Sequence, residues 1–124
     1  NQLDKGGNPY INHPIAVAKG VTTIKQKIIA LLHDVCEDSE ITFNDLMIMG
    51  FPEDIIASLK VITKNKDMPY QQYLTNLKNN HDARIVKIAD IKHNMDLSRI
   101  PNPTSIDFKR RENYQEALNF LLDD

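Results

Sequence analysis

The sequence predicts an all-α protein, a compact helical bundle of about six to seven helices. Two observations predict this class. The alternation of apolar and polar residues that marks a half-buried strand is absent, and the β-branched residues recur at helical spacing. The 124 residues are enough for one domain with a single sizeable core. We therefore expect residues 1–124 to form a single domain.

Helix-start signals indicate where the first two helices begin. A short helix is expected over residues 11–19, with Pro14 in its first turn, where a missing N–H is tolerated. Thr22 or Thr23 is expected to cap the second helix. This helix should run over about residues 24–37, through the most apolar stretch of the N-terminal half.

The third and fourth helices begin at a threonine and at a proline. Thr42 precedes Asp45 by three residues, which is the spacing of a capping box. Gly50 is expected to end that helix, because glycine is the residue that most often follows a helix. Pro52 then opens a fourth helix that reaches about Thr63.

The rest of the chain predicts three more helices. Pro69 opens a fifth helix that extends to about Lys78. Asp82 is expected to cap a sixth helix over about residues 83–100. A last helix should cover roughly residues 105–122.

Composition and charge exclude several classes of function. The formal net charge of -2 does not fit a general binder of nucleic acid or of membranes, although a cleft can differ in charge from the whole. No apolar run approaches the roughly 20 residues of a membrane span, and no signal peptide opens the chain. The single Cys36 excludes an internal disulfide framework and suits a reducing compartment. We therefore expect a cytoplasmic protein.

The end of the second helix carries four polar side chains on one arc. Residues 28–32 are apolar on every side, which is typical of a helix buried in the middle of a domain. At ~100° per residue, one arc then holds His33, Asp34, Glu37 and Asp38. Burial and mutual repulsion would raise the pKa values of these carboxylates and destabilise their charged forms. A divalent cation has the opposite effect, because it stabilises ionised carboxylates and a neutral imidazole. The alternative is an ordinary acidic helix end in solvent.

A second apolar segment, residues 85–91, is interrupted by Asp90. An aspartate on a buried face needs a cation, a basic side chain or several N–H donors as its partner. For Asp90 alone, a salt bridge to Lys87 or Lys92, or a cap contact, is the favoured alternative. Asn94 lies one turn beyond Asp90 on the same helix.

The remaining histidines carry weaker signals. His13 stands at the start of the first helix, where a histidine is more often a cap or a surface residue than a ligand. His81 and His93 lack a distinguishing pattern, and we interpret both as structural or exposed. The residue types alone therefore leave the set of metal ligands open.

Three segments of the chain resemble the hydrolase half of RelA/SpoT-type alarmone enzymes and the small stand-alone alarmone hydrolases. They are NPYINHPIAVA (8–18), ALLHDVCED (30–38) and VKIADIKHNMDL (86–97). They occur in the family's order with compatible spacing, and residues 43–64 match the family's stretch of two helices. The resemblance covers about residues 4–100. It implies an HD-superfamily phosphohydrolase with an all-helical HD-type fold.

The resemblance also implies roles for individual residues. The implied metal ligands are His13, His33, Asp34 and Asp90. The implied catalytic pair, which orients and activates water, is Glu37 and Asp38. The implied substrate-binding residues are Lys5 and Asn94. The cofactor implied is one divalent cation, usually Mn²⁺.

The residue types suit this chemistry. Two histidines and two carboxylates favour Mn²⁺, Fe²⁺, Co²⁺ or Zn²⁺, and no thiolate cluster indicates structural zinc. Such an ion lowers the pKa of a bound water and polarises the P–O bond, so that Glu37 can accept the proton while Asp38 holds the water or the base in line. Positioning and charge neutralisation supply most of the catalysis of phosphoryl transfer, so a domain this small is adequate.

Several positions that contact the nucleotide in the family differ in this chain. Asp4 precedes Lys5, where the family often has two or more basic residues. Ile91 follows Asp90, where family members often carry Arg or Lys, and Leu97 also departs from the family's pattern. The metal ligands and the acidic pair match the family, whereas the residues around the nucleotide do not all match.

We expect a manganese-dependent phosphohydrolase that removes the 3′-diphosphate from guanosine-3′,5′-bis(diphosphate), with no synthetase activity. The expected partner is a small phosphorylated nucleotide, and neither nucleic acid nor a membrane. Two alternatives stay open. One is a phosphatase for another nucleotide or dinucleotide phosphate, and the other is a non-catalytic HD module that binds a nucleotide. A helical bundle without metal would leave the acidic arc unexplained.

Overall fold

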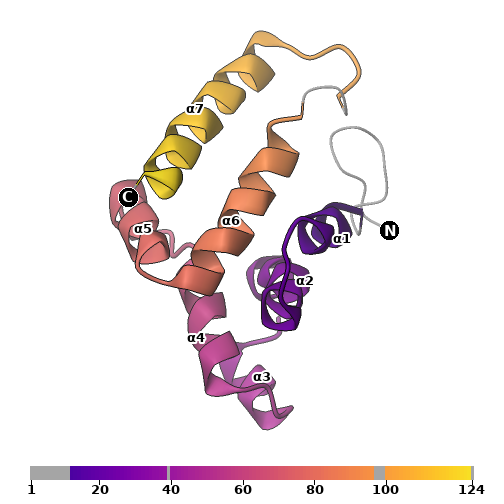
Figure 1. Ribbon diagram of the computed structural model, residues 1–124, viewed down its shortest axis with the longest axis vertical. Helices are drawn as coiled ribbons and strands as arrows, with labels where there is room; N and C mark the ends of the chain where they lie inside the picture. The colour runs from indigo at the N-terminus through magenta and orange to yellow at the C-terminus, as the bar shows by residue number, and fades with distance from the viewer. Residues whose placement is uncertain (1–11, 39, 97–99, 124) are drawn as a thin grey trace.

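Seven α-helices make up the part of the chain that the computed structural model describes, residues 12–38, 40–96 and 100–123, and no strand occurs in it (Figure 1). They are α1 (Asn12–Lys19), α2 (Ile24–Asp38), α3 (Phe43–Ile48), α4 (Glu53–Ile62), α5 (Tyr70–Lys78), α6 (His81–Asn94) and α7 (Ser105–Leu122). The all-α class predicted from the sequence is confirmed.

Local signals in the sequence explain where the early helices begin and end. The Thr23 hydroxyl accepts the Gln26 N–H at 3.0 Å, so the second of the two candidate threonines caps α2. The predicted capping box of α3 is confirmed, because Thr42 Oγ1 accepts the Asp45 N–H at 3.1 Å and the Asp45 carboxylate accepts the Thr42 N–H at 2.8 Å. Gly50 follows α3 at φ +97°, a left-handed conformation that costs glycine little.

The predicted start of α6 was wrong by two residues. Asn80, not Asp82, is its N-cap, and the Asn80 side-chain oxygen accepts the Ala83 N–H at 3.1 Å. Asp82 lies in the first turn, where its carboxylate accepts a hydrogen bond from Gln26 Nε2 on α2 at 3.1 Å. Asn80 and Asp82 are both residue types that cap helices, and the sequence alone did not show that Asp82 contacts α2.

The predicted end of α6, near residue 100, was also wrong. The helix ends at Asn94, with Met95 as its C-cap. The Met95 N–H still bonds to the carbonyl of Ile91 at 2.9 Å, but the Asp96 N–H bonds to His93 at 3.3 Å, which closes the last turn more tightly. No glycine or proline marks this position, so the apolar pattern suggested a longer helix.

The helix α6 is central to the fold, since it contacts α1, α2, α4, α5 and α7. Figure 1 places α5 and α7 on one side of α6 and α1 and α2 on the other. All seven helices contribute fully buried side chains to one core: Val17, Ile29, Leu46, Leu59, Ile62, Leu77, Val86, Ile91 and Leu121. Each such burial stabilises the fold by roughly 1.5–3 kcal/mol relative to an exposed side chain.

The helix α2 is less buried than its sequence predicted. Ile29 and Ala30 are fully buried, but Leu31 is 43% exposed. The all-round apolar segment therefore faces α1, α4 and α6 on one side and remains accessible on another. The prediction of a helix buried on every side was wrong for this residue.

Two close contacts hold α1 in position. The Lys27 ammonium on α2 donates to the carbonyls of Ala18 and Val21 at 2.9 Å each, which ties α2 to the end of α1 and the turn after it. At Gly20, a Cβ atom would lie 3.4 Å from the Cβ of Ala89 on α6, so the end of α1 approaches α6 closely. These contacts bring the N-terminal helix alongside the two helices that carry the other candidate ligands.

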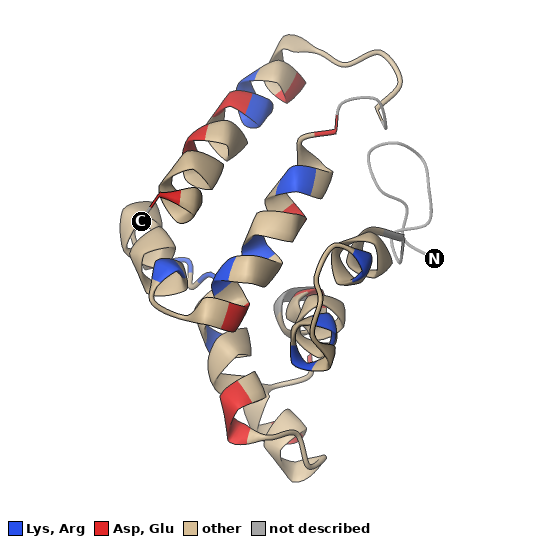
Figure 2. Cartoon of the chain, in the orientation of Figure 1, with Lys and Arg blue, Asp and Glu red and all other residues tan. Residues whose placement is uncertain are grey.

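Charged residues of both signs are interspersed over the helices. Figure 2 shows Lys and Arg alternating with Asp and Glu along α7, and acidic residues in the first turn of α4. None of the described helices combines the length and the apolar character needed to cross a membrane.

Candidate metal centre

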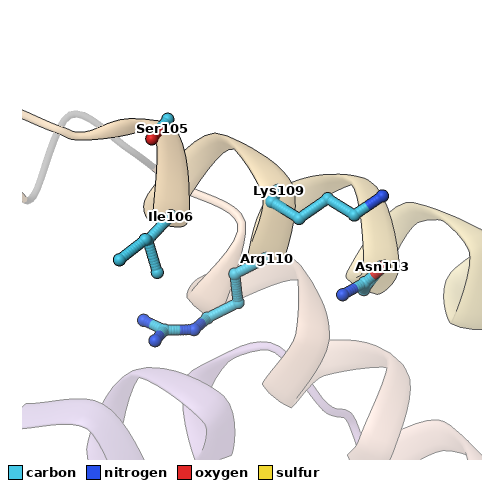
Figure 3. A pocket seen from close by; sticks show the side chains of 5 residues that line it. All are labelled: Ser105, Ile106, Lys109, Arg110 and Asn113. Atoms are coloured by element: carbon cyan, nitrogen blue, oxygen red, sulfur yellow. The ribbon is translucent and has the colours of Figure 1, made fainter.

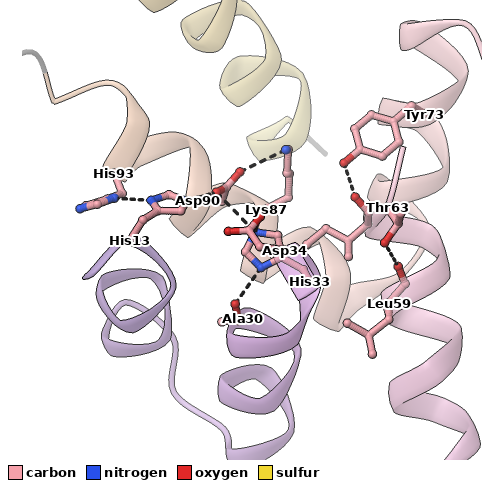
Figure 4. A network of polar contacts seen from close by, with 11 residues as sticks. His13, Ala30, His33, Asp34, Leu59, Thr63, Tyr73, Lys87, Asp90 and His93 are labelled. Carbon is pink, nitrogen blue, oxygen red and sulfur yellow. Dashed lines mark hydrogen bonds and ion pairs between the residues drawn. The ribbon is translucent and has the colours of Figure 1, made fainter. Parts of the chain in front are cut away.

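Three buried side chains from three helices meet at one point. His13 comes from the first turn of α1, His33 from α2 and Asp90 from α6. One potential ligand atom of each lies within 4.8 Å of the other two. The Nε2 atoms of the two histidines both approach Asp90 Oδ1, at 2.7 Å from His13 and 3.6 Å from His33 (Figure 4). Such a cluster of nitrogen and oxygen donors fits a divalent cation.

A backbone contact fixes the orientation of His33. Its Nδ1 lies 2.7 Å from the carbonyl oxygen of Ala30, one turn earlier on α2. A carbonyl can only accept, so His33 Nδ1 carries the hydrogen and donates it. The lone pair of the neutral ring is then on Nε2, the atom that faces Asp90. Metal-binding histidines commonly have this arrangement, in which the second ring nitrogen donates to a carbonyl.

The carboxylate of Asp90 divides its two oxygens between different partners. Oδ1 faces the histidines, and Oδ2 accepts a hydrogen bond from Lys87 Nζ at 3.1 Å. Of the two lysines proposed from the sequence as alternative partners, Lys87 is therefore the one in contact, and Lys92 is exposed. The ion pair does not exclude a metal ligand, because the two oxygens point to different groups.

The pKa values of this cluster follow from burial and from the charges around it. Burial acts to raise the pKa of Asp90, but the hydrogen bonds from His13 and His33 and the charge of Lys87 outweigh it and hold this pKa well below its usual range. Burial acts to lower the pKa of His33, but the contacts with Asp90 and the charge of Asp34 outweigh it and raise this pKa. The site therefore stabilises a buried negative charge on Asp90.

Asp34 lies at the edge of the cluster. Its Oδ1 is 3.2 Å from His33 Nε2, and its side chain is 14% exposed. Asp34 stands outside the group of atoms that lie within 4.8 Å of one another, so the structure brings together three of the four ligands that the resemblance implies. The role of each of the four as a ligand stays a prediction.

His93 is a neighbour of the cluster that the sequence analysis missed. It is partly buried on α6, and its Nδ1 lies 2.6 Å from Nδ1 of His13. The interpretation of His93 as a structural or exposed residue overlooked this contact. His81 is exposed, which is one of the two options that the sequence analysis gave for it. The one available signal was spacing, because His93 follows Asp90 by three residues and thus lies on the same face of a helix.

The other implied site residues are described only in part. Lys5 lies outside the described residues. Glu37 and Asp38 are the last two residues of α2, and their side chains are outside what the structure describes. Asn94 is the last residue of α6, partly buried and one turn beyond Asp90. Their catalytic and binding roles stay predictions.

A pocket that the sequence did not predict lies at the beginning of α7. It has a volume of about 420 Å³ and is lined by Ser105, Ile106, Lys109, Arg110 and Asn113 (Figure 3). Two of these side chains are cationic. Burial and the charge of Asp90 raise the pKa of Tyr114, while Lys87 and Arg110 act in the opposite direction. The charges of Asp90, in the candidate metal centre, and of Arg110, in the pocket, thus both act on the Tyr114 hydroxyl.

Comparisons with known proteins identify relatives of this chain. No protein-family model matches it. The protein of Mus musculus named guanosine-3′,5′-bis(diphosphate) 3′-pyrophosphohydrolase MESH1 is 34% identical over 125 residues, which cover 91% of this chain and 69% of the mouse protein. The Danio rerio protein of the same name is 35% identical over 108 residues, which cover 77% of this chain and 59% of the fish protein.

One solved structure supports the fold. It is described as a metazoan orthologue of SpoT that hydrolyses ppGpp, and it matches with a TM-score of 0.75 at 24% identity, over 98% of this chain and 76% of the other. This match confirms the HD-type all-α fold that was expected from the sequence.

The chain spans 59% to 69% of the length of the four vertebrate relatives that carry the MESH1 name. The identity with the mouse protein extends over more than two thirds of that protein. The resemblance to alarmone hydrolases found in the sequence is therefore confirmed. The chain belongs to the MESH1 family, whose members named here carry the name guanosine-3′,5′-bis(diphosphate) 3′-pyrophosphohydrolase.

Proposed function

We propose that this chain, as a single domain, is a manganese-dependent pyrophosphohydrolase that removes the 3′-diphosphate from guanosine-3′,5′-bis(diphosphate). The observation that carries the proposal is the convergence of His13, His33 and Asp90, three buried side chains from three helices, on one point. The vertebrate relatives carry the name of this activity, which supports the choice of substrate.

The types of donor atom in the cluster support a bound divalent cation such as Mn²⁺. Two imidazole nitrogens and a carboxylate oxygen are ligands that Mn²⁺ accepts. A structural zinc site usually has several thiolate ligands, and Cys36 is the single cysteine of the sequence. In its neutral form, His33 presents a lone pair on Nε2, because its Nδ1 carries the hydrogen and donates it to Ala30. We propose Asp34, which lies beside His33, as the fourth ligand.

The chemistry divides between the cation and the protein. A divalent ion held there would lower the pKa of a coordinated water and polarise the phosphoryl group under attack. We assign Glu37 as the base that accepts the proton of the attacking water and Asp38 as the residue that orients it. They follow His33 and Asp34 by one turn of α2, which keeps the four positions on one side of the helix. The water oxygen forms a bond to the phosphorus next to the ribose, and the bond from this phosphorus to the ribose 3′-oxygen breaks. The 3′-oxygen leaves and takes up a proton to become a hydroxyl, and the diphosphate, which now carries the water oxygen, is released as pyrophosphate.

The pocket on α7 supports an anionic substrate. Lys109 and Arg110 line it, and Arg110 is only loosely paired, at 3.8 Å from Asp107. A guanidinium group suits a phosphate because it offers several N–H donors in a fixed plane. We propose that Arg110 contacts the nucleotide, together with Lys5 and Asn94.

The proposal is tested by the products of the reaction. Protein supplied with Mn²⁺ is incubated with guanosine-3′,5′-bis(diphosphate), with a dinucleotide phosphate or with a nucleoside monophosphate, and the products are separated by anion-exchange chromatography. We expect equal amounts of guanosine 5′-diphosphate and pyrophosphate from the first substrate. If the protein hydrolysed only one of the other two substrates, that substrate would replace the proposed one. If the protein bound manganese but hydrolysed none of the three, a non-catalytic nucleotide-binding module would be favoured.

Variants separate the metal ligands from the catalytic base. His13→Ala and Asp90→Ala should retain no manganese and lose turnover, and His81→Ala, on the exposed start of α6, is the matched control. Glu37→Gln should retain the metal but lose roughly 10²- to 10⁴-fold in kcat, the usual contribution of a general base. Normal turnover by Glu37→Gln would remove this residue from the mechanism.

A further inference from the structure

The contact between His13 and His93 is a part of the cluster that the proposed mechanism does not use. The two Nδ1 atoms lie 2.6 Å apart, a hydrogen-bonding distance, and the ring centroids are 4.8 Å apart with the planes inclined by 30°. The residues are 80 positions apart in the sequence, and they come from α1 and α6. Figure 4 shows His93 on the far side of His13 from Asp90.

This contact occupies Nδ1 of His13, so Nε2 is the ring nitrogen that is left to bind a cation. The other ring nitrogen, Nε2, is the atom that faces Asp90, at 2.7 Å. To bind a cation through Nε2, a neutral ring must carry its hydrogen on Nδ1 and donate it to a neighbour. Nδ1 of His93 is at the right distance to accept that hydrogen.

His93 differs in one respect from the partner of His33. The partner of His33 is the Ala30 carbonyl, which can only accept, so the orientation and tautomer of His33 are fixed by the backbone. An imidazole nitrogen can either accept or donate. His93 can therefore accept from His13 when Nε2 binds a cation, and donate to His13 when a hydrogen on Nε2 faces Asp90. The contact can persist in both situations.

We infer that His93 is a positioning residue of the metal centre, which holds the ring of His13 so that Nε2 presents its lone pair to the cation. The inference rests on the proposed metal-dependent function. The geometry of α6 supports it, because Asp90 and His93 are one turn apart on the same helix. That helix thus supplies a ligand and the residue that orients a second ligand.

The test measures the affinity for Mn²⁺ without nucleotide, by titration followed through the electron paramagnetic resonance signal of free Mn²⁺. His93→Phe keeps a ring of similar size without a nitrogen, and we expect its affinity to fall by about 10- to 100-fold. His93→Asn keeps a hydrogen-bonding atom near the position of Nδ1 and should restore affinity close to that of the wild type. His81→Phe, on the exposed first residue of the same helix, is the matched control and should bind as the wild type does.

Two further readouts separate positioning from a general structural role. Thermal unfolding in chelator should be similar for the wild type and for His93→Asn. Nitrogen-15 NMR of the wild type loaded with diamagnetic Zn²⁺ should find the hydrogen of His13 on Nδ1, which tests the inference even if His93→Phe does not fold. A hydrogen on neither nitrogen, or metal binding through Nδ1, would overturn it.

The outcomes distinguish this inference from the proposed function. Equal Mn²⁺ affinity in the wild type and in His93→Phe would overturn the role of His93 and leave the metal centre standing. Failure of the wild type to bind Mn²⁺ would overturn both. Tight Mn²⁺ binding that depends on His93, without hydrolysis of guanosine-3′,5′-bis(diphosphate), would support the inference and contradict the proposed substrate.

Discussion

Replacing Asp90 with asparagine removes the negative charge that three side chains face. Asp90 Oδ1 lies 2.7 Å from His13 Nε2 and 3.6 Å from His33 Nε2, and Oδ2 lies 3.1 Å from Lys87 Nζ. Asparagine keeps the size of the side chain and one oxygen but not the charge. In Asp90→Asn the ammonium of Lys87 therefore remains in place without its counter-charge.

The magnitude follows from the burial of this ion pair. The side chains of Lys87 and Asp90 are 19% and 7% exposed, so the pair is largely shielded from solvent. Burial acts to lower the pKa of Lys87, but the charge and hydrogen bond of Asp90, together with the charges of Tyr73 and Tyr70, outweigh burial and raise this pKa, so the carboxylate favours the charged form of the lysine. Removing one partner of a buried pair costs about 3–5 kcal/mol. Because Lys87 retains some exposure, we expect the lower end, about 3 kcal/mol.

The assay is urea unfolding in the presence of chelator, so that no bound metal contributes to the free energy of unfolding. A loss of about 3 kcal/mol should lower the midpoint by roughly 1–3 M urea. Lys87→Met combined with Asp90→Asn should recover much of the loss, because the unpaired ammonium is then gone. An unchanged midpoint for Asp90→Asn, or a double variant no more stable than Asp90→Asn alone, would refute the reasoning.

Three further predictions concern other groups. Without metal, the folded state raises the pKa of His33, so the protonated ring stabilises the fold. This stabilisation should be complete below pH 6.5, the pKa of an unperturbed histidine, and should be lost as the pH rises through the higher pKa of the folded state. Urea unfolding in chelator, measured against pH, should show this loss in the wild type and not in His33→Gln. Arg110→Gln should raise KM for guanosine-3′,5′-bis(diphosphate) with little change in kcat, whereas the exposed Arg111→Gln should leave both unchanged. Tyr73→Phe removes the 2.5 Å hydrogen bond to the Ile62 carbonyl and should cost about 1–2 kcal/mol in thermal unfolding; no loss would mean that water replaces the hydroxyl.

Local rules explain why most helix boundaries could be predicted from the sequence. The capping box of Thr42 and Asp45 and the prolines at positions 52 and 69 act within one turn of chain, so they need no knowledge of the fold. Two of the predictions failed because they depend on how the helices pack against one another. Asp82 bonds to α2 instead of capping α6, and Leu31 is 43% exposed although the segment around it is apolar on every side.

The candidate site divides in the same way. Residue types and the resemblance pointed to His13, His33 and Asp90, because each stands in a recognisable segment. The role of His93 depends on the ring of His13, 80 residues away in the sequence, and a local pattern does not predict such a long-range contact. The cationic pocket on α7 was missed for a similar reason, since the basic run of residues 109–111 does not show which of its side chains line a pocket.

The most direct measurement is anomalous X-ray diffraction from crystals of the protein grown with Mn²⁺. We predict one strong anomalous peak among His13 Nε2, His33 Nε2 and Asp90 Oδ1, with His13→Ala as the control that lacks it. A peak bound elsewhere, or none at these three atoms in manganese-soaked crystals, would contradict a shared cation at the meeting point of α1, α2 and α6.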